Sequence, residues 1–188
     1  MNKIAEKLTD YIIAKNIIEE KNRELYKFGF LVALEKFIFL IICLTIAIYM
    51  NSFLMALIFF IIFIPLRSFA GGFHFDSYKL CFFMSCLVYI FCVFFGDFFC
   101  FSRMTYMIVV FLLELGIYYI YPVDHVNRMV DDEENIYFKK KLFFWLGIDI
   151  ALAIVCMTFD NIEYLQVIVN AIFVVFITMI LGKVRIAI

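Results

Sequence analysis

One short stretch of this chain contains the residue types that peptide-bond chemistry needs. It begins at Arg67 and ends at Cys81, and Gly71, Gly72 and His74 lie between them. A cysteine paired with a histidine is the minimum for nucleophilic acyl transfer, because the imidazole can take the thiol proton. The spacing alone also fits interface and packing roles, since the chain has six cysteines.

Cys81 is expected near the start of a helix. Asp76 and Ser77 are good N-cap residues, and the sequence that follows them is apolar and helical in character. The positive end of the helix dipole would stabilise negative charge on a sulfur in the first turn. The sequence therefore predicts a nucleophilic thiol at residue 81.

The residues before Cys81 have matching roles on this interpretation. His74, in the loop before the helix, would act as the base. The amides around Gly71 and Gly72 are candidates for an oxyanion site. Arg67 would hold a substrate carboxylate or fix the loop to a lipid phosphate.

The composition indicates a membrane protein. The 188 residues are 66% hydrophobic and only 18% charged, with a mean hydropathy of +1.03, whereas soluble domains are about half apolar. The net charge is -1, and no basic patch carries interleaved aromatic residues, so we expect no nucleic-acid partner.

Six apolar runs predict an all-α integral membrane protein with about six transmembrane helices. A span needs roughly 20 residues, and the second run covers only about 21 Å as a helix. The runs are Phe28 to Met50, Phe53 to Leu66, Leu80 to Phe101, Met104 to Tyr121, Leu142 to Phe159 and Tyr164 to Leu181.

The positions of the basic residues predict the orientation. Lys and Arg beside spans stay on the cytoplasmic side, and with six spans nearly all of them fall on one side. Of the residues outside the runs, only Arg103 falls on the other side. Both termini and the His74 to Cys81 segment should therefore face the cytoplasm.

Residues 1–27 are expected to form an amphipathic helix at the membrane surface, ahead of a single transmembrane domain over residues 28–188. Apolar residues recur among Lys and Glu at helical spacing, which suits a surface anchor or a substrate contact. No cleavable signal is expected there, because the segment is charged throughout. The apolar residues that recur in residues 1–27 are Ile4, Leu8, Tyr11, Ile12 and Ile18.

Within the transmembrane domain we expect a catalytic loop at 65–81 and a cytoplasmic loop at 122–141.

Two carboxyl groups fall deep inside apolar runs, where a lone charge is costly. Glu114 and Asp149 could be protonated, bonded to Gln166 or Asn170, or part of a substrate cavity. Asp97 is nearer the end of its run and is interpreted as interfacial. The cysteines other than Cys81 are expected to be small packing residues; they are Cys43, Cys86, Cys92, Cys100 and Cys156.

No metal or cofactor is expected. His125 lies near several carboxylates, but the chain has no His-Glu-x-x-His and no Cys-x-x-Cys sequence. The charged residues around it are typical of a solvated loop.

The order of Arg67, Gly71-Gly72, His74, Ser77 and Cys81 after a hydrophobic hairpin resembles the signature of the accessory gene regulator B (AgrB) family of quorum-sensing membrane endopeptidases. The sequence Tyr121-Pro122-Val123-Asp124, followed by a charged loop ending at Lys139-Lys140-Lys141, is similar to a second family feature. The likeness covers nearly the whole chain. The acidic residues 131–134 match no family motif, and no third catalytic residue is assured, since Asp76 is a candidate for capping.

The resemblance implies a cysteine endopeptidase in the cell membrane of a Gram-positive bacterium. It would cut a small precursor of the AgrD type on the C-terminal side of the pheromone sequence, with Cys81 as nucleophile and His74 as base, and close a thiolactone or lactone ring. The bilayer and the precursor are the implied partners, and a homodimer is allowed. The rival hypotheses are a non-enzymatic small transporter or assembly scaffold, with Glu114, Asp149 and Asn170 along a polar path, and a metal-dependent intramembrane protease.

Overall fold

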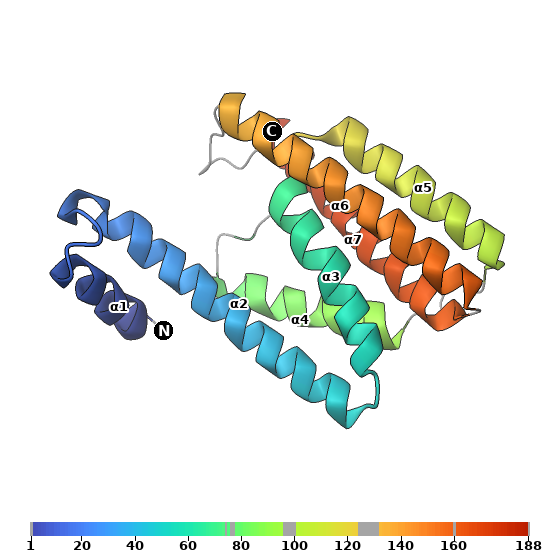
Figure 1. Cartoon of the computed structure of the whole chain (residues 1–188), viewed down its shortest axis with the longest axis horizontal. Helices are drawn as coiled ribbons and strands as arrows, with labels where there is room; N and C mark the ends of the chain where they lie inside the picture. The colour runs from blue at the N-terminus through green and yellow to red at the C-terminus, as the bar shows by residue number, and fades with distance from the viewer. Residues whose placement is uncertain are drawn as a thin grey trace. The chain divides into compact units, whose positions relative to one another are not determined.

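The computed structural model describes residues 2–73, 75, 78–95, 101–123, 132–159 and 161–187. The chain forms two compact units, residues 1–49 and residues 50–188, which are described separately. In the described part, helices are the only extended regular elements (Figure 1). The predicted all-α fold is confirmed.

The first unit is a helical hairpin. Helix α1 (Asn2–Ala14) is followed by a 3-10 turn, η1 (Glu20–Asn22), and by the long helix α2 (Arg23–Tyr49), whose beginning packs against α1. The expectation of one amphipathic helix over residues 1–27 was therefore wrong in its length, because the chain leaves the helix after Ala14. Asn16, with φ of 54°, lies in the connection that turns it back.

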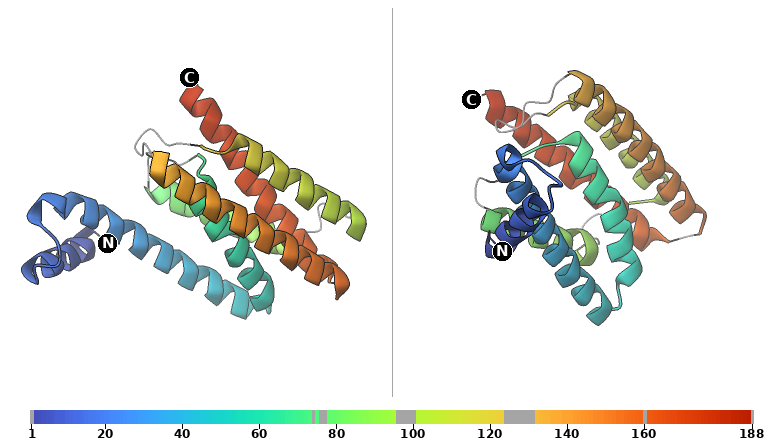
Figure 2. Two further views of the ribbon diagram at one scale, coloured as in Figure 1. Left: turned by 45° about the horizontal axis from the view of Figure 1, so that its top comes forward. Right: turned by 60° about the vertical axis from the view of Figure 1, so that its left-hand side comes forward.

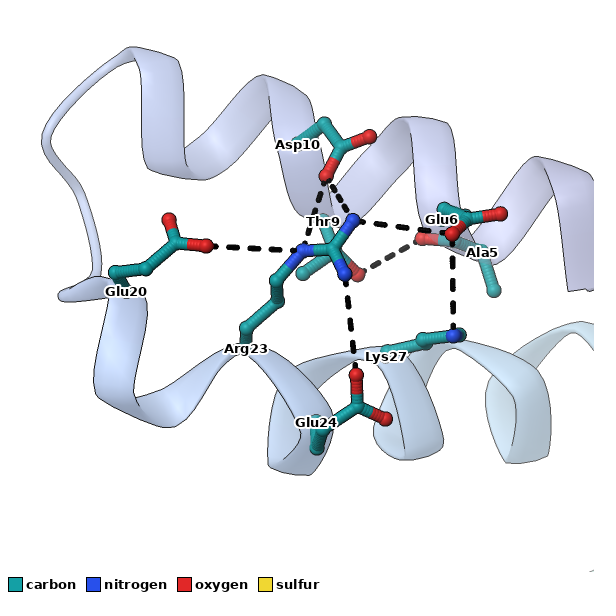
Figure 3. A network of polar contacts seen from close by, with 8 residues as sticks. All are labelled: Ala5, Glu6, Thr9, Asp10, Glu20, Arg23, Glu24 and Lys27. Atoms are coloured by element: carbon teal, nitrogen blue, oxygen red, sulfur yellow. Dashed lines mark hydrogen bonds and ion pairs between the residues drawn. The ribbon is translucent and has the colours of Figure 1, made fainter.

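Charged side chains hold α1 against the start of α2 (Figure 3). Arg23 Nη2 lies 2.7 Å from Asp10 Oδ1 and 3.8 Å from Glu6 Oε1. The same guanidinium lies 3.9 Å from Glu20 and 3.8 Å from Glu24. Exposed ion pairs contribute only about 0–1 kcal/mol each, so the network fixes the geometry of the hairpin more than it stabilises it.

Five helices are long and apolar enough to cross a membrane among the described residues: Glu20–Tyr49, Phe53–Ala70, Arg103–Ile120, Glu134–Thr158 and Ile162–Arg185. The apolar part of α4, Leu80–Phe94, is shorter and covers roughly 22 Å at 1.5 Å per residue. The chain is therefore a multi-pass membrane protein of five to six spans. The short helix is α4, whereas the sequence predicted that the second span would be short.

The second unit is built around its last helix. Helices α3 (Phe53–Ala70), α4 (Tyr78–Phe94), α5 (Arg103–Ile120) and α6 (Asp132–Thr158) all contact α7 (Ile162–Ala187) (Figures 1 and 2). In the span of α7, 61% of the residues are buried, against 22–33% in α3, α5 and α6. The core side chains of α7 include Leu165, Ile168, Ile172, Val175 and Met179.

Helix α3 continues through Pro65 to Ala70, although proline usually ends or kinks a helix. Its buried residues Phe59, Ile62, Leu66 and Ala70 recur at helical spacing, and they maintain one packed face beyond the proline. Non-helical backbone therefore begins at residue 71, and the predicted loop 65–81 is shorter than expected.

Helix α6 begins at Asp132, about ten residues before the apolar run that predicted it. The residues from Asp132 to Lys141 are thus helical, and the predicted cytoplasmic loop 122–141 is shortened in the same way. Lys139 lies over the ring of Tyr118 on α5, 5.5 Å from its centroid. Contacts of this cation–π kind let a charged helical turn pack beside an apolar neighbour.

Candidate functional site

Two glycines carry the chain out of α3. Gly71 has φ of 77° and Gly72 has φ of 122°, a region that residues with a side chain rarely adopt. A Cβ on Gly71 would collide with the carbonyl oxygen of Val123, and one on Gly72 would lie 2.6 Å from Arg67 Nη1. Gly71 also forms an isolated parallel β-bridge with Val123, which follows α5. The two glycines therefore let the chain turn away from α3 close to the backbone of Val123.

The segment 71–73 lies directly on helix α7. The amide of Phe73 donates a hydrogen bond of 2.7 Å to the carbonyl oxygen of Thr178. A Cβ on Gly182 would lie 2.9 Å from both Gly72 C and Phe73 N. The absence of a side chain at residue 182 therefore lets the backbone of the segment touch the helix. Arg185 lies over the Phe73 ring, 5.3 Å from its centroid.

Arg67 binds the backbone of the segment that follows it. Its Nη1 donates to the carbonyl oxygen of Gly71, and its Nη2 donates to that of Phe73. The sequence predicted a contact with a substrate carboxylate or a lipid phosphate, but two guanidinium nitrogens are used within the chain. Arg67 thus holds residues 71–73 in place from the last turn of α3.

Cys81 is the fourth residue of α4, as the sequence predicted for a thiol in the first turn. It is half-buried, and its carbonyl oxygen accepts a 2.9 Å hydrogen bond from Ser85 Oγ. The charge of Arg67 interacts electrostatically with Cys81. The guanidinium is therefore the group that connects the segment 71–73 with the start of α4.

The other predicted residues of the site, His74, Asp76 and Ser77, lie outside the described residues. His74 directly follows Phe73 in the sequence, and the next residue, Phe75, packs its ring edge-on against Phe73 at 4.9 Å. The structure thus brings Arg67 together with the two glycines, and the same guanidinium interacts electrostatically with Cys81. The pairing of His74 with Cys81 and the caps at Asp76 and Ser77 stay predictions.

The remaining described cysteines fit the expected packing role. Cys43, Cys92 and Cys156 are buried and Cys86 is half-buried. Cys100 lies outside the described residues, as do Asp97 and His125. Among residues that the structure describes, no group of three or more His, Cys, Asp or Glu could hold a metal ion.

Sequence reasoning missed the surfaces on which the segment rests. Val123, Thr178 and Gly182 lie about 50 to 110 residues away along the chain, so no local spacing connects them with Gly72. One signal was available: a glycine inside a helical pattern often marks a close backbone approach. Gly182 is such a residue.

Glu114 and Asp149 are buried on α5 and α6. No oxygen of either carboxyl group has a hydrogen-bond partner among the described residues. The suggested bonds to Gln166 or Asn170 are therefore not formed. The two carboxyl groups interact electrostatically with each other.

A family model described as "Accessory gene regulator B" matches residues 3–181 of the chain. The search of curated proteins found no match, and the search of solved structures found none either.

Proposed function

Because the chain belongs to the accessory gene regulator B family, it has a role in quorum-sensing peptide processing, and we propose that it is the cysteine endopeptidase that cuts and cyclises the peptide. Family membership implies a precursor of the AgrD type as substrate. The finer proposal names the residues: Cys81 as nucleophile, His74 as base, and the backbone amides at Gly71 and Gly72 as donors to the oxyanion. It requires no cofactor.

The observation that carries the proposal is the position of Arg67. Its guanidinium bonds to the carbonyl oxygens of Gly71 and Phe73 and interacts with Cys81. Phe73 is bonded through the chain to His74, so the guanidinium that interacts with the proposed nucleophile also anchors the residue before the proposed base. Such anchoring supports catalysis, because reacting groups must be held close to their productive geometry.

The first chemical step forms an acyl-enzyme. The Cys81 thiol gives its proton to His74, and the sulfur attacks the carbonyl carbon at the C-terminal end of the pheromone sequence. The carbon–nitrogen bond breaks, His74 returns the proton to the leaving amine, and the C-terminal fragment departs. The precursor is then held through a thioester to Cys81.

The second step closes the ring. A cysteine thiol or serine hydroxyl of the precursor loses its proton to His74 and attacks the thioester carbonyl. The bond to Cys81 breaks, and the Cys81 sulfur takes the proton back. A thiolactone or lactone forms, and restricting water at the acyl-enzyme stage favours this outcome over hydrolysis.

The proposed environment is the inner face of the cell membrane, with both termini and the site on the cytoplasmic side. Helix α1 leaves Ile4, Leu8 and Tyr11 exposed, and these apolar side chains would contact the interfacial lipid or a membrane-bound precursor. The apolar faces of the helices would also allow two copies of the chain to associate as a homodimer.

The test is cleavage of an AgrD-type precursor by the purified chain in lipid vesicles. Cys81→Ala and Cys81→Ser should abolish cleavage, and His74→Ala should abolish it while precursor binding is retained. Cys86→Ala is the matched control, because Cys86 is a second half-buried thiol on the same helix, and it should cleave normally. Cleavage by the Cys81→Ala variant would remove the proposal, and full activity of His74→Ala would leave Cys81 without its base.

A further inference from the structure

A second group of titratable side chains lies away from the proposed catalytic segment. Glu114 on α5 is only 4% exposed and Asp149 on α6 is 0% exposed. None of the four carboxyl oxygens has a hydrogen-bond partner within the described part of the chain. Buried polar atoms in proteins nearly always have a partner, so a group of four without one needs an explanation.

The two carboxyl groups belong to one packed group of helices. They interact electrostatically, helices α5 and α6 contact each other, and both contact α7. On α7 the buried polar residues are the uncharged Gln166 and Asn170. Two carboxyl groups from neighbouring helices thus face a common apolar interior.

No cation of the described residues forms an ion pair with either carboxyl group. On their own helices, Lys141 precedes Asp149 by eight residues, about 12 Å along a helix, and Arg103 precedes Glu114 by eleven, about 16 Å. Arg67 on α3 is bonded to Gly71 and Phe73. The other charged or titratable side chains that the structure describes on α3, α5, α6 and α7 are Tyr106, Tyr118, Tyr119, Glu134, Tyr137, Lys139, Lys140, Cys156, Glu163, Tyr164, Lys183 and Arg185.

Ionising both groups would place two like charges without a counter-ion in a low-dielectric interior. An unpaired charge inside a membrane domain is costly, and a second like charge nearby adds to this cost. A multivalent metal would require more oxygen ligands than two carboxyl groups supply. Protonation removes both charges with no further ligand.

We propose that Glu114 and Asp149 form a proton-binding site within the membrane domain, in which both carboxyl groups carry a proton while α5, α6 and α7 are packed together. Separation of these helices exposes the pair to water and releases the protons. The packed form therefore binds more protons than the separated form, so a rise in pH favours separation.

This site connects to the catalytic segment through the backbone. Nine residues after Glu114, the chain reaches Val123, which forms the bridge with Gly71. Helix α7 carries Thr178, whose carbonyl oxygen holds Phe73. Any loosening of α5 or α7 on proton release thus changes the support of residues 71–73.

Infrared spectroscopy of the full chain in lipid vesicles tests the protonation directly. At neutral pH the spectrum should contain C=O stretching bands of protonated carboxyl groups, which shift in D2O. Glu114→Gln and Asp149→Asn should each remove one such band. The control Glu163→Gln, at an exposed carboxylate on α7, should remove none of these bands. Cys81→Ala should remove none either, so the infrared result does not depend on whether Cys81 is the nucleophile of a peptidase.

Two outcomes would overturn the proposal of a proton-binding site. The first is a neutral-pH spectrum in which neither variant removes a protonated band, which means that both groups are ionised. The second is a protonated band that disappears when sodium is added at constant pH, which would make the pair a sodium site.

A second measurement tests how the stability of the packed helices depends on pH. Thermal unfolding in detergent should show that the wild-type chain loses stability from neutral to alkaline pH more steeply than the Glu114→Gln/Asp149→Asn double variant. Equal pH dependence of the two proteins would contradict the proposal. If the double variant does not insert, the comparison is made with each single variant.

Discussion

The guanidinium of Arg67, in the last turn of α3, interacts electrostatically with Cys81 in the first turn of α4. The same group bonds to the carbonyl oxygens of Gly71 and Phe73. One side chain therefore binds residues 71 and 73 and also acts electrostatically on the only cysteine that the sequence places in a catalytic motif.

Replacing Arg67 by lysine should reduce precursor cleavage by roughly 10- to 100-fold, because a lysine keeps the charge but cannot bond to both carbonyl oxygens. Hydrogen bonds to charged groups are worth about 1.5–3 kcal/mol each, which corresponds to that range. Cleavage in vesicles measures the effect, with Arg103→Lys, at an exposed arginine on α5, as the control. An unchanged rate for Arg67→Lys would mean that the charge alone suffices.

Replacing Gly182 by alanine should displace the segment 71–73 from α7, since the new methyl group would lie 2.9 Å from Gly72 C and Phe73 N. Backbone atoms cannot move aside cheaply, so we expect a loss of about 1–3 kcal/mol in stability together with a lower cleavage rate. Gly147→Ala is the matched control, because a Cβ there meets no atom within 4 Å. That variant should unfold at the same or a higher temperature, since alanine favours a helix over glycine. Equal behaviour of the two variants would contradict the close packing.

Iodoacetamide labelling should distinguish a peptidase from a passive transporter. Cys81 should react roughly tenfold or more faster than the other thiols at near-neutral pH, because the proposed base His74 would take its proton and the thiolate is the reactive form. Cys86 provides the comparison, since it is equally half-buried but lies five residues further along the helix. Mass spectrometry of digested protein gives the rate at each cysteine. Similar rates at both sites would favour the transporter hypothesis.

Replacing Arg23 by alanine should loosen the hairpin of α1 and α2, because four carboxylates lie within 4 Å of its guanidinium. Hydrogen exchange of α1 should increase, and high salt should produce a similar increase in the wild-type chain. Lys21→Ala removes only an exposed pair with Glu19 and should leave the exchange unchanged. The labelling rate of Cys81 serves as a check that the second unit is intact.

Much of the fold could be predicted from the sequence, because apolar length is a local property of the chain. Runs of apolar residues predicted the membrane helices, and only their ends were wrong. Helix α3 passes Pro65 because its packed face continues beyond the proline, and α6 begins at Asp132, where acidic residues suit the start of a helix. Contacts between helices that are far apart in the sequence cannot be inferred from one local segment.

The sequence by itself determined that the chain is a helical membrane protein, since composition is a property of neighbouring residues. Its close spacing of Arg67, His74 and Cys81 also predicted where the catalytic residues would lie, and that assignment stays a prediction. Only the tertiary structure decided that Arg67 bonds to the backbone, that residues 71–73 rest on Thr178 and Gly182, and that Glu114 interacts electrostatically with Asp149. These contacts join residues between four and about 110 positions apart. They depend on how the helices pack against α7, and helix packing is set by the shapes of whole helix faces.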